Sequence, residues 1–188
     1  ELEFSPDGRW LALRTDNGEP GAGDILGIRT SGDTTPIPLA ASPFAELHPA
    51  FSPDGQWLAY TSSEGGNPEV FVRSMADGAS GRWQVSTGGG AQPRWSPDGR
   101  ELYYFNIATG EVSAARLRTQ PDFDVVDRRA LFRATSAIAD PFHQSYDVLR
   151  DGSGFVTIHA RDEGRAAPLP PLVLGEHWFT ELDARAAR

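Results

Sequence analysis

A short turn motif recurs along this chain and constrains its fold more than any other feature. Residues 51–55 (FSPDG) lead into the apolar run 57–60 (WLAY), and close copies begin at Phe4 and Trp95. In such a motif proline presets φ for a turn, aspartate bonds nearby backbone amides, and glycine supplies a positive φ. Apolar residues on both sides of the turn predict a β-hairpin.

The spacing of the copies predicts a β-propeller. A degenerate fourth copy, residues 148–152 (VLRDG), precedes another β-rich run at 155–158. The turn aspartates at 7, 54, 98 and 151 are 47, 44 and 53 residues apart. A period in the forties, with one hairpin and two further strands per repeat, is the signature of a propeller blade.

We therefore predict an all-β fold, a partial β-propeller of about four antiparallel four-stranded blades in one domain over residues 1–188. The blade boundaries are expected near residues 1–41, 42–87, 88–134 and 135–176, followed by a short C-terminal helix over 177–188. In the third repeat an insertion over 119–129 delays the fourth strand to Ala130–Arg133. Second strands such as 57–61 are apolar on both faces, which favours blades stacked on one another.

Composition excludes some classes of partner. The chain has 17 basic and 26 acidic residues, and its net charge of −9 disfavours contact with nucleic acid or an anionic membrane. No apolar run approaches the roughly 18 residues of a membrane span. The chain contains no cysteine, so neither disulfides nor thiolate metal sites are expected.

The repeated pattern F/W-S-P-D-G-(R/Q)-x-L resembles the TolB-type, WD-like propeller repeat of bacteria, over essentially the whole chain. The tail, residues 171–182 (PLVLGEHWFTEL), is similar to the closing strand and helix of such propellers, although His177 replaces an expected asparagine. The fourth copy also departs from the pattern, with Leu149-Arg150 in place of Ser-Pro. The resemblance implies a six-bladed ring.

Because the chain lacks an initial methionine, we expect it to be the C-terminal part of a longer bacterial protein, with about two blades and an upstream domain missing. The first repeat would then expose Trp10, Leu11 and Leu13 where a neighbouring blade should pack. A periplasmic or extracytoplasmic location is favoured over the cytoplasm. The resemblance further implies an upstream serine/threonine kinase or winged-helix domain as one possibility.

Two sets of residues are candidates for a structural or binding role. The turn residues are expected to brace the hairpins: Asp7, Gly8, Asp54, Gly55, Asp98, Gly99, Asp151 and Gly152. Three residues before each apolar anchor (Phe4, Phe51, Trp95, Val148) stand the polar residues Glu1, His48, Gln92 and Ser145. We expect these four near the channel mouth, as a rim that contacts a ligand or partner, although residues beside loops are commonly polar in any case.

The sequence lacks the catalytic motifs that its repeats could suggest. There is no G-x-S-x-G nucleophile elbow, and the S-P-D-G turn lacks the spacing of a sialidase-type Asp box. The four histidines (His48, His143, His159, His177) have no metal-ligand spacing, and Gly88–Gly90 precedes a strand rather than a helix. We expect no metal and no cofactor.

We therefore predict a non-catalytic module for protein or peptide interaction, or for ligand sensing. The alternatives are the sensor segment of a kinase or winged-helix regulator, and part of a propeller enzyme, such as a lyase, lactonase or peptidase-associated propeller, whose site lies in the missing blades.

Overall fold

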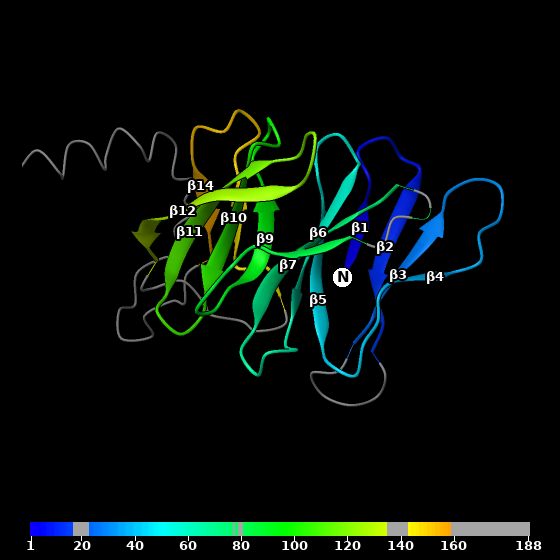
Figure 1. Ribbon diagram of the computed structural model, residues 1–188, viewed down its shortest axis with the longest axis horizontal. Helices are drawn as coiled ribbons and strands as arrows, with labels where there is room; N and C mark the ends of the chain where they lie inside the picture. Colours follow the sequence, from blue (N-terminus) through cyan, green and yellow to red (C-terminus); the bar gives the residue numbers. More distant parts are fainter. Residues whose placement is uncertain (17–22, 77, 79–80, 135–142, 159–188) are drawn as a thin grey trace, which may run out of the picture.

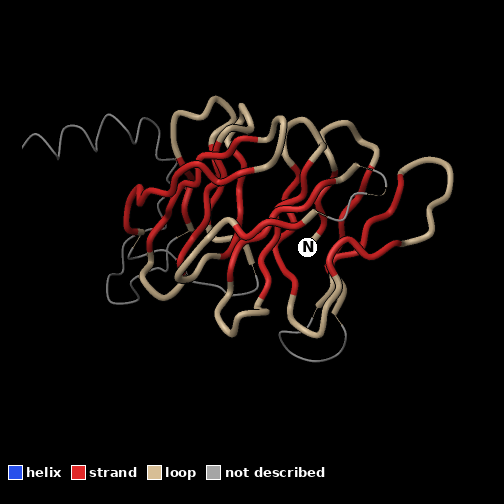
Figure 2. Tube along the Cα trace, in the orientation of Figure 1, coloured by secondary structure: helices blue, strands red, loops and turns tan. Residues whose placement is uncertain are grey.

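The computed structural model describes residues 1–16, 23–76, 78, 81–134 and 143–158. In this part of the chain every regular element is a β-strand (Figures 1 and 2). The first sheet contains β1 (Leu2–Phe4), β2 (Trp10–Arg14), β3 (Ile25–Arg29) and β4 (Ile37–Ala40). The second contains β5 (Glu46–Phe51), β6 (Trp57–Ser62), β7 (Glu69–Ser74) and β8 (Arg82–Gln84). The third contains β9 (Ala91–Trp95), β10 (Glu101–Asn106), β11 (Glu111–Arg118) and β12 (Asp124–Arg133). A final pair consists of β13 (Tyr146–Val148) and β14 (Phe155–Thr157).

Each four-stranded sheet is an antiparallel meander in which consecutive strands are neighbours. This confirms the all-β prediction and three blade-like sheets of four strands. The fourth repeat is seen as a pair of strands. The predicted C-terminal helix over 177–188 lies outside the described residues, and the division into blades at the boundaries given above stays a prediction.

The sheets follow one another in chain order, from the first sheet (blue) at one end to the third (green) towards the other (Figure 1). A separate hydrophobic core lies between each sheet and the next. Strand β6 serves two of these cores, because Leu58 packs towards the first sheet and Ala59 towards the third. Both side chains are fully buried, which confirms that the second strand is covered on both faces.

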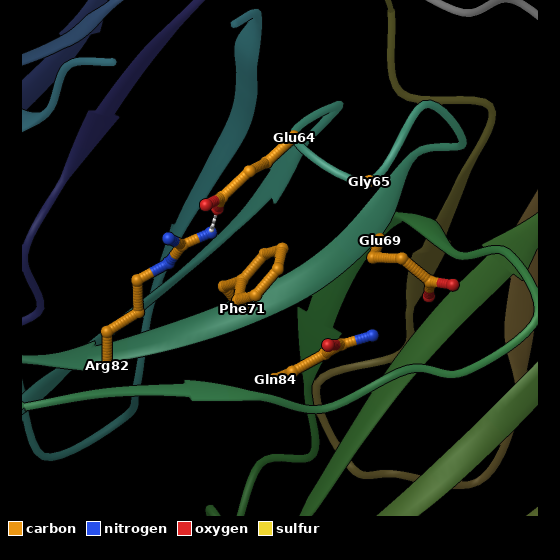
Figure 3. Close-up of a pocket in the computed structure, with 6 residues that line it drawn as sticks. All are labelled: Glu64, Gly65, Glu69, Phe71, Arg82 and Gln84. Atoms are coloured by element: carbon orange, nitrogen blue, oxygen red, sulfur yellow. Dashed lines mark ion pairs between the residues drawn. The ribbon is translucent and has the colours of Figure 1, made fainter.

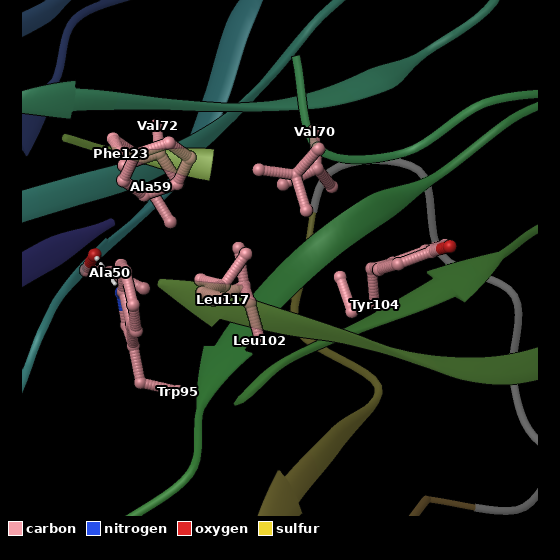
Figure 4. Close-up of a cluster of buried hydrophobic side chains, with 11 residues drawn as sticks. Ala50, Ala59, Val70, Val72, Trp95, Leu102, Tyr104, Leu117 and Phe123 are labelled. Carbon is pink, nitrogen blue, oxygen red and sulfur yellow. Dashed lines mark hydrogen bonds between the residues drawn. The ribbon is translucent and has the colours of Figure 1, made fainter. Parts of the chain in front are cut away.

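The apolar anchors of the second and third repeats fill the interface with the preceding sheet. Phe51 belongs to the core shared with the first sheet, and Trp95 belongs to the core shared with the second. Trp95 Nε1 also donates a hydrogen bond to the carbonyl oxygen of Ala50 (3.0 Å; Figure 4). Phe4 holds the same place in the first sheet, where no described sheet precedes it, and 62% of its surface is exposed.

The prediction that Trp10 lies on the exposed face is wrong. Side chains alternate along a strand, and Trp10 and Ala12 point to the buried face of the first sheet. Leu11 and Leu13 point to the opposite face, opposite Phe4 and Leu2 in the ladder. The open face therefore carries the two leucines of β2 together with the strongly exposed residues of β1.

The S-P-D-G turns have the same hydrogen bonds in all three full copies. In the first, the Ser5 carbonyl accepts the N–H of Gly8, and Ser5 Oγ donates to Asp7 Oδ1 (2.7 Å) while accepting the N–H of Trp10. Gly8, Gly55 and Gly99 have φ of 69°, 69° and 70°, which confirms the predicted positive φ. The Leu149–Gly152 turn closes with the corresponding backbone hydrogen bond.

Strand β12 differs from its prediction. It spans Asp124–Arg133, six residues more than the predicted Ala130–Arg133, and therefore includes residues 124–129 of the expected insertion. The additional residues pair with β11, whose eight residues extend far enough to provide partners. Two register shifts in this pairing accommodate the extra chain length.

Candidate functional site

The first strands of successive sheets lie side by side: β1 contacts β5, β5 contacts β9, and β9 contacts β13. The four polar residues that stand three positions before the anchors lie in these strands or directly before them. Glu1 directly precedes β1, His48 lies in β5, Gln92 lies in β9, and Ser145 directly precedes β13. The structure therefore brings all four to one line of contact across the sheets.

Hydrogen bonds join these residues from sheet to sheet. The backbone N–H of His48 donates to Glu1 Oε2 (2.9 Å), and that of Ser145 donates to Gln92 Oε1 (2.8 Å). Between them, Thr61 Oγ1 accepts the N–H of Gln92 and also lies within hydrogen-bonding distance of His48 Nδ1, both at 3.1 Å. Polar bonds at the first strands thus link the sheets in addition to the apolar cores.

The backbone at two of these positions is unusual. His48 and Gln92 have φ of 55° and 58°, in the left-handed region that residues with a side chain seldom adopt. Each precedes a proline, Pro49 or Pro93, and each lies where the register of the ladder shifts. A bulge of this kind re-aims a residue out of the regular ladder, and here the N–H groups point to acceptors on other strands.

Three of the four residues are buried. His48, Gln92 and Ser145 expose 3% of their surface or less, because the neighbouring first strands close over them. They do not form the exposed rim that was expected. Their geometry makes them links between sheets, and a ligand-binding role for them stays a prediction.

An open cavity of about 640 Å³ lies near the carboxyl ends of the same strands, beside the S-P-D-G turns. The first three sheets line it in a repeated way. The turns contribute Pro6, Pro53 and Pro97, and the first strands contribute Glu3, Ala50 and Arg94. Arg150, from the fourth repeat, joins Glu3 and Arg94 as a charged residue of the lining. Residues far apart in the sequence therefore converge on one hollow.

Charged groups give this cavity its chemical character. Burial raises the pKa of the Glu3 carboxyl above its usual range, and the nearby Arg94 guanidinium partly offsets this effect. Arg94 Nε lies 3.3 Å from Asp147 Oδ1, and the Asp147 side chain is 71% exposed. The arrangement can bind polar or charged groups between apolar proline and aromatic walls.

The sequence contained a signal for this cavity that was missed. The lining residues Glu3, Ala50 and Arg94 all stand one residue before an anchor, whereas Glu1, His48, Gln92 and Ser145 stand three residues before it. In a regular strand, the side chains one and three residues before the anchor point to the same face. The bulges at His48 and Gln92 instead turn the position three residues before the anchor inward. Residue propensities alone do not predict where a bulge lies.

The described residues lack two further features. Among them, no group of three or more histidine, aspartate or glutamate side chains is arranged to hold a metal ion. The same residues include no helix of the length and apolarity that crossing a membrane requires.

Comparison with known proteins gives a family and a set of similar structures. The family model described as the TolB beta propeller domain matches residues 2–127. A protein assigned as TolB from Agrobacterium tumefaciens has a TM-score of 0.60 and 23% identity, over 89% of this chain and 56% of its own. TolB from Acinetobacter baumannii has a TM-score of 0.60 and 17% identity, over 87% of this chain and 38% of its own.

Enzymes share the fold as well. Hydrazine synthase from Kuenenia stuttgartiensis has a TM-score of 0.57 and 17% identity, over 83% of this chain and 54% of its own. At these identities the similarities show the fold alone. This chain spans 56% of the Agrobacterium tumefaciens protein and 38% of TolB from Acinetobacter baumannii. No curated protein matches the sequence.

Proposed function

Because this chain belongs to the TolB β-propeller family, we propose that it is a non-catalytic module that binds a protein or peptide partner, or senses a ligand, through the cavity beside the turns. The observation that carries this proposal is the convergence of the first three sheets on one hollow of about 640 Å³. Binding residues are commonly placed on loops and strand ends that a rigid scaffold positions, and this hollow is built in that way.

The lining supports recognition of a partner with mixed chemistry. Pro6, Pro53 and Pro97 supply rigid apolar contacts at repeated intervals, and proline loses little conformational freedom on binding. Arg94 and Arg150 supply guanidinium groups, and Glu3 supplies a partly desolvated carboxyl group. Such pockets combine apolar walls with a few charged groups that fix orientation.

The proposal is tested by binding with matched variants. The immobilised chain is exposed to bacterial extract, and bound proteins are quantified by mass spectrometry. A partner of the cavity is recovered on the parent chain, lost on the double variant Arg94→Gln/Arg150→Gln, and retained on Arg100→Gln, which removes an exposed arginine outside the cavity. Equal recovery of every protein on all three chains would refute the proposal.

Two other roles are alternatives to this proposal. A sensor segment attached to a serine/threonine kinase or winged-helix regulator would use the same cavity for recognition. A propeller enzyme would instead need a reactive centre, and a metal-content assay together with hydrolase and lyase assays on the purified chain separates these roles. We expect no metal and no turnover. Stoichiometric metal or measurable turnover would favour the enzyme.

A further inference from the structure

A separate hollow lies on the flank of the second sheet and shares no lining residue with the cavity beside the turns. Its volume is about 480 Å³. Strands β7 and β8 supply Glu69, Phe71, Arg82 and Gln84, and the loop between β6 and β7 supplies Glu64 and Gly65 (Figure 3). Arg82 also lines a neighbouring hollow of about 380 Å³, together with Tyr60 and with residues of the first sheet such as Leu39.

Arg82 is the central group of this flank hollow. Its guanidinium carbon lies 3.8 Å from the centre of the Phe71 ring, a cation–π contact that holds the planar group in place. Its Nη2 lies 2.5 Å from Glu64 Oε2 (Figure 3). The Arg82 side chain is 36% exposed and that of Glu64 is 46% exposed. An exposed ion pair of this type contributes little to stability.

A second arginine makes the position of Arg82 unusual. Arg73 faces Arg82 directly across β7 and β8, and like charges at opposed positions destabilise a sheet. Arg73 has a structural role, since its Nη1 donates to the carbonyl oxygen of Leu39 in the first sheet. In the third sheet Arg128 Nε similarly donates to the carbonyl oxygen of Val85, which directly follows β8 (2.6 Å). In the described part of the chain Arg82 pairs instead with Glu64, from the β6–β7 loop of its own sheet.

The other carboxylate that lines the flank hollow, that of Glu69, is turned away from Arg82. Glu69 accepts hydrogen bonds from Ser86 Oγ and from the N–H of Gly89. Figure 3 shows its carboxylate pointing away from Arg82, on the far side of Phe71. Glu64 is therefore the carboxylate that occupies the guanidinium group.

On the opposite face of the second sheet, aromatic side chains fill part of the space towards the third sheet. Trp57, Trp83 and Phe123 contact one another there, with ring centres 5.0–5.5 Å apart. The other face of this sheet carries Phe71 and Arg82, which line the flank hollow. The two faces of the second sheet therefore differ in character: aromatic rings pack on one, and the other carries a charged hollow.

We propose that the flank hollow binds a small organic carboxylate with a flat apolar part. The ligand carboxylate takes the place of Glu64 on the Arg82 guanidinium, which presents a planar set of donors suited to two parallel hydrogen bonds. The apolar part lies beside Phe71, and the volume is within the range of small-molecule sites. Glu64 is thus an internal competitor that the ligand displaces.

The probe is benzoylglycine, a flat aromatic carboxylate, added to the isotope-labelled 188-residue chain and followed by nuclear magnetic resonance. We expect saturable shifts of the Gly65, Arg82 and Gln84 signals. Benzoylglycinamide has nearly the same shape without the charge. Its affinity should be lower by about tenfold or more, because a charge-assisted pair of hydrogen bonds is lost. Equal binding of the two compounds, or no binding of either, overturns the proposal.

Variants separate the roles of the two charged residues. Arg82→Gln should weaken benzoylglycine binding about tenfold or more. Arg100→Gln is the control and should leave binding unchanged, because Arg100 pairs with Asp98 outside the hollow. Glu64→Gln should bind benzoylglycine several-fold more tightly, a gain that misfolding cannot produce. Unchanged binding in Arg82→Gln, or unchanged or weaker binding in Glu64→Gln, overturns the proposal. Neither outcome bears on the cavity beside the turns.

Discussion

At the scale of single residues, the turns depend on backbone conformations that few side chains accept. Gly55 has φ of 69°, and a Cβ there would meet only ordinary contacts, the nearest with Asp7 at 3.4 Å. Gly55→Val should therefore lower the free energy of unfolding by about 1–2 kcal/mol through backbone strain alone. Chemical denaturation measures the change. Gly65→Val is the control, because Gly65 has no positive φ and a Cβ added there would meet no atom of another part of the chain within 4 Å. Equal effects of both substitutions would disprove the turn assignment.

A turn carboxylate should also respond to pH. Hydrogen bonds from the Ser5 hydroxyl first, and then from Arg9, lower the pKa of Asp7 from 3.8 to about 2. A group with a lowered pKa stabilises the fold above its unfolded pKa, and that stability is lost as the pH falls from about 3.8 through about 2. Carbon-13 titration of the Asp7 carboxyl should give a midpoint near 2 in the parent and a higher midpoint in Ser5→Ala. Ser52→Ala, in the next turn, should leave the midpoint unchanged. A parent midpoint at the ordinary value would contradict the hydrogen-bond geometry.

At the scale of elements, the bulged first strands need polar acceptors. The buried Thr61 hydroxyl accepts the N–H of Gln92 from the next sheet and lies close to His48 Nδ1. Thr61→Val has nearly the same shape but leaves that N–H without this acceptor, and it should cost about 1–3 kcal/mol of stability. Thr61→Ser keeps the hydroxyl and should cost less, as thermal and chemical unfolding will show. If valine is tolerated as well as serine, the link between β6 and β9 is unimportant.

At the scale of the whole molecule, the sheets form a stack with one open apolar end in the described residues. The outward face of the first sheet carries Leu2 and Phe4, which are 71% and 62% exposed, paired with Leu13 and Leu11 in the ladder. Phe51 and Trp95, at the same place in the next two repeats, are buried against a preceding sheet. Contiguous apolar faces of more than a few hundred Å² usually mark an interaction surface.

We therefore expect this 188-residue chain to self-associate through that face in solution. Light scattering should show oligomers for the parent and a shift towards monomer for the double variant Leu2→Ser/Phe4→Ser. Phe44→Ser is the matched control, since Phe44 is also exposed, at 43%, but lies in the segment between the first and second sheets. A stable parent monomer would show that the open face does not drive association.

The local pattern of residues was enough to predict much of this architecture. The S-P-D-G turns combine a fixed proline φ, an aspartate acceptor and a permissive glycine, so their hairpins could be placed residue by residue. Trp57–Ser62, apolar on both faces, implied sheets stacked on either side, and Leu58 and Ala59 do face different cores. These features are local or repeat at a fixed spacing, and for that reason the sequence alone reveals them.

Other features depend on contacts between sheets. The left-handed φ of His48 and Gln92 costs energy within each strand, and it persists where the re-aimed groups meet partners from other sheets, such as Glu1, Thr61 and Ser145. That compensation buried residues expected at an exposed rim. The sequence alone determined the repeat, the turns and the two-faced strands, because each follows from neighbouring residues. Only the tertiary structure decided which of the polar side chains are buried between sheets and which, such as those of Glu3 and Arg94, line a cavity. That outcome depends on how adjacent sheets pack against each other.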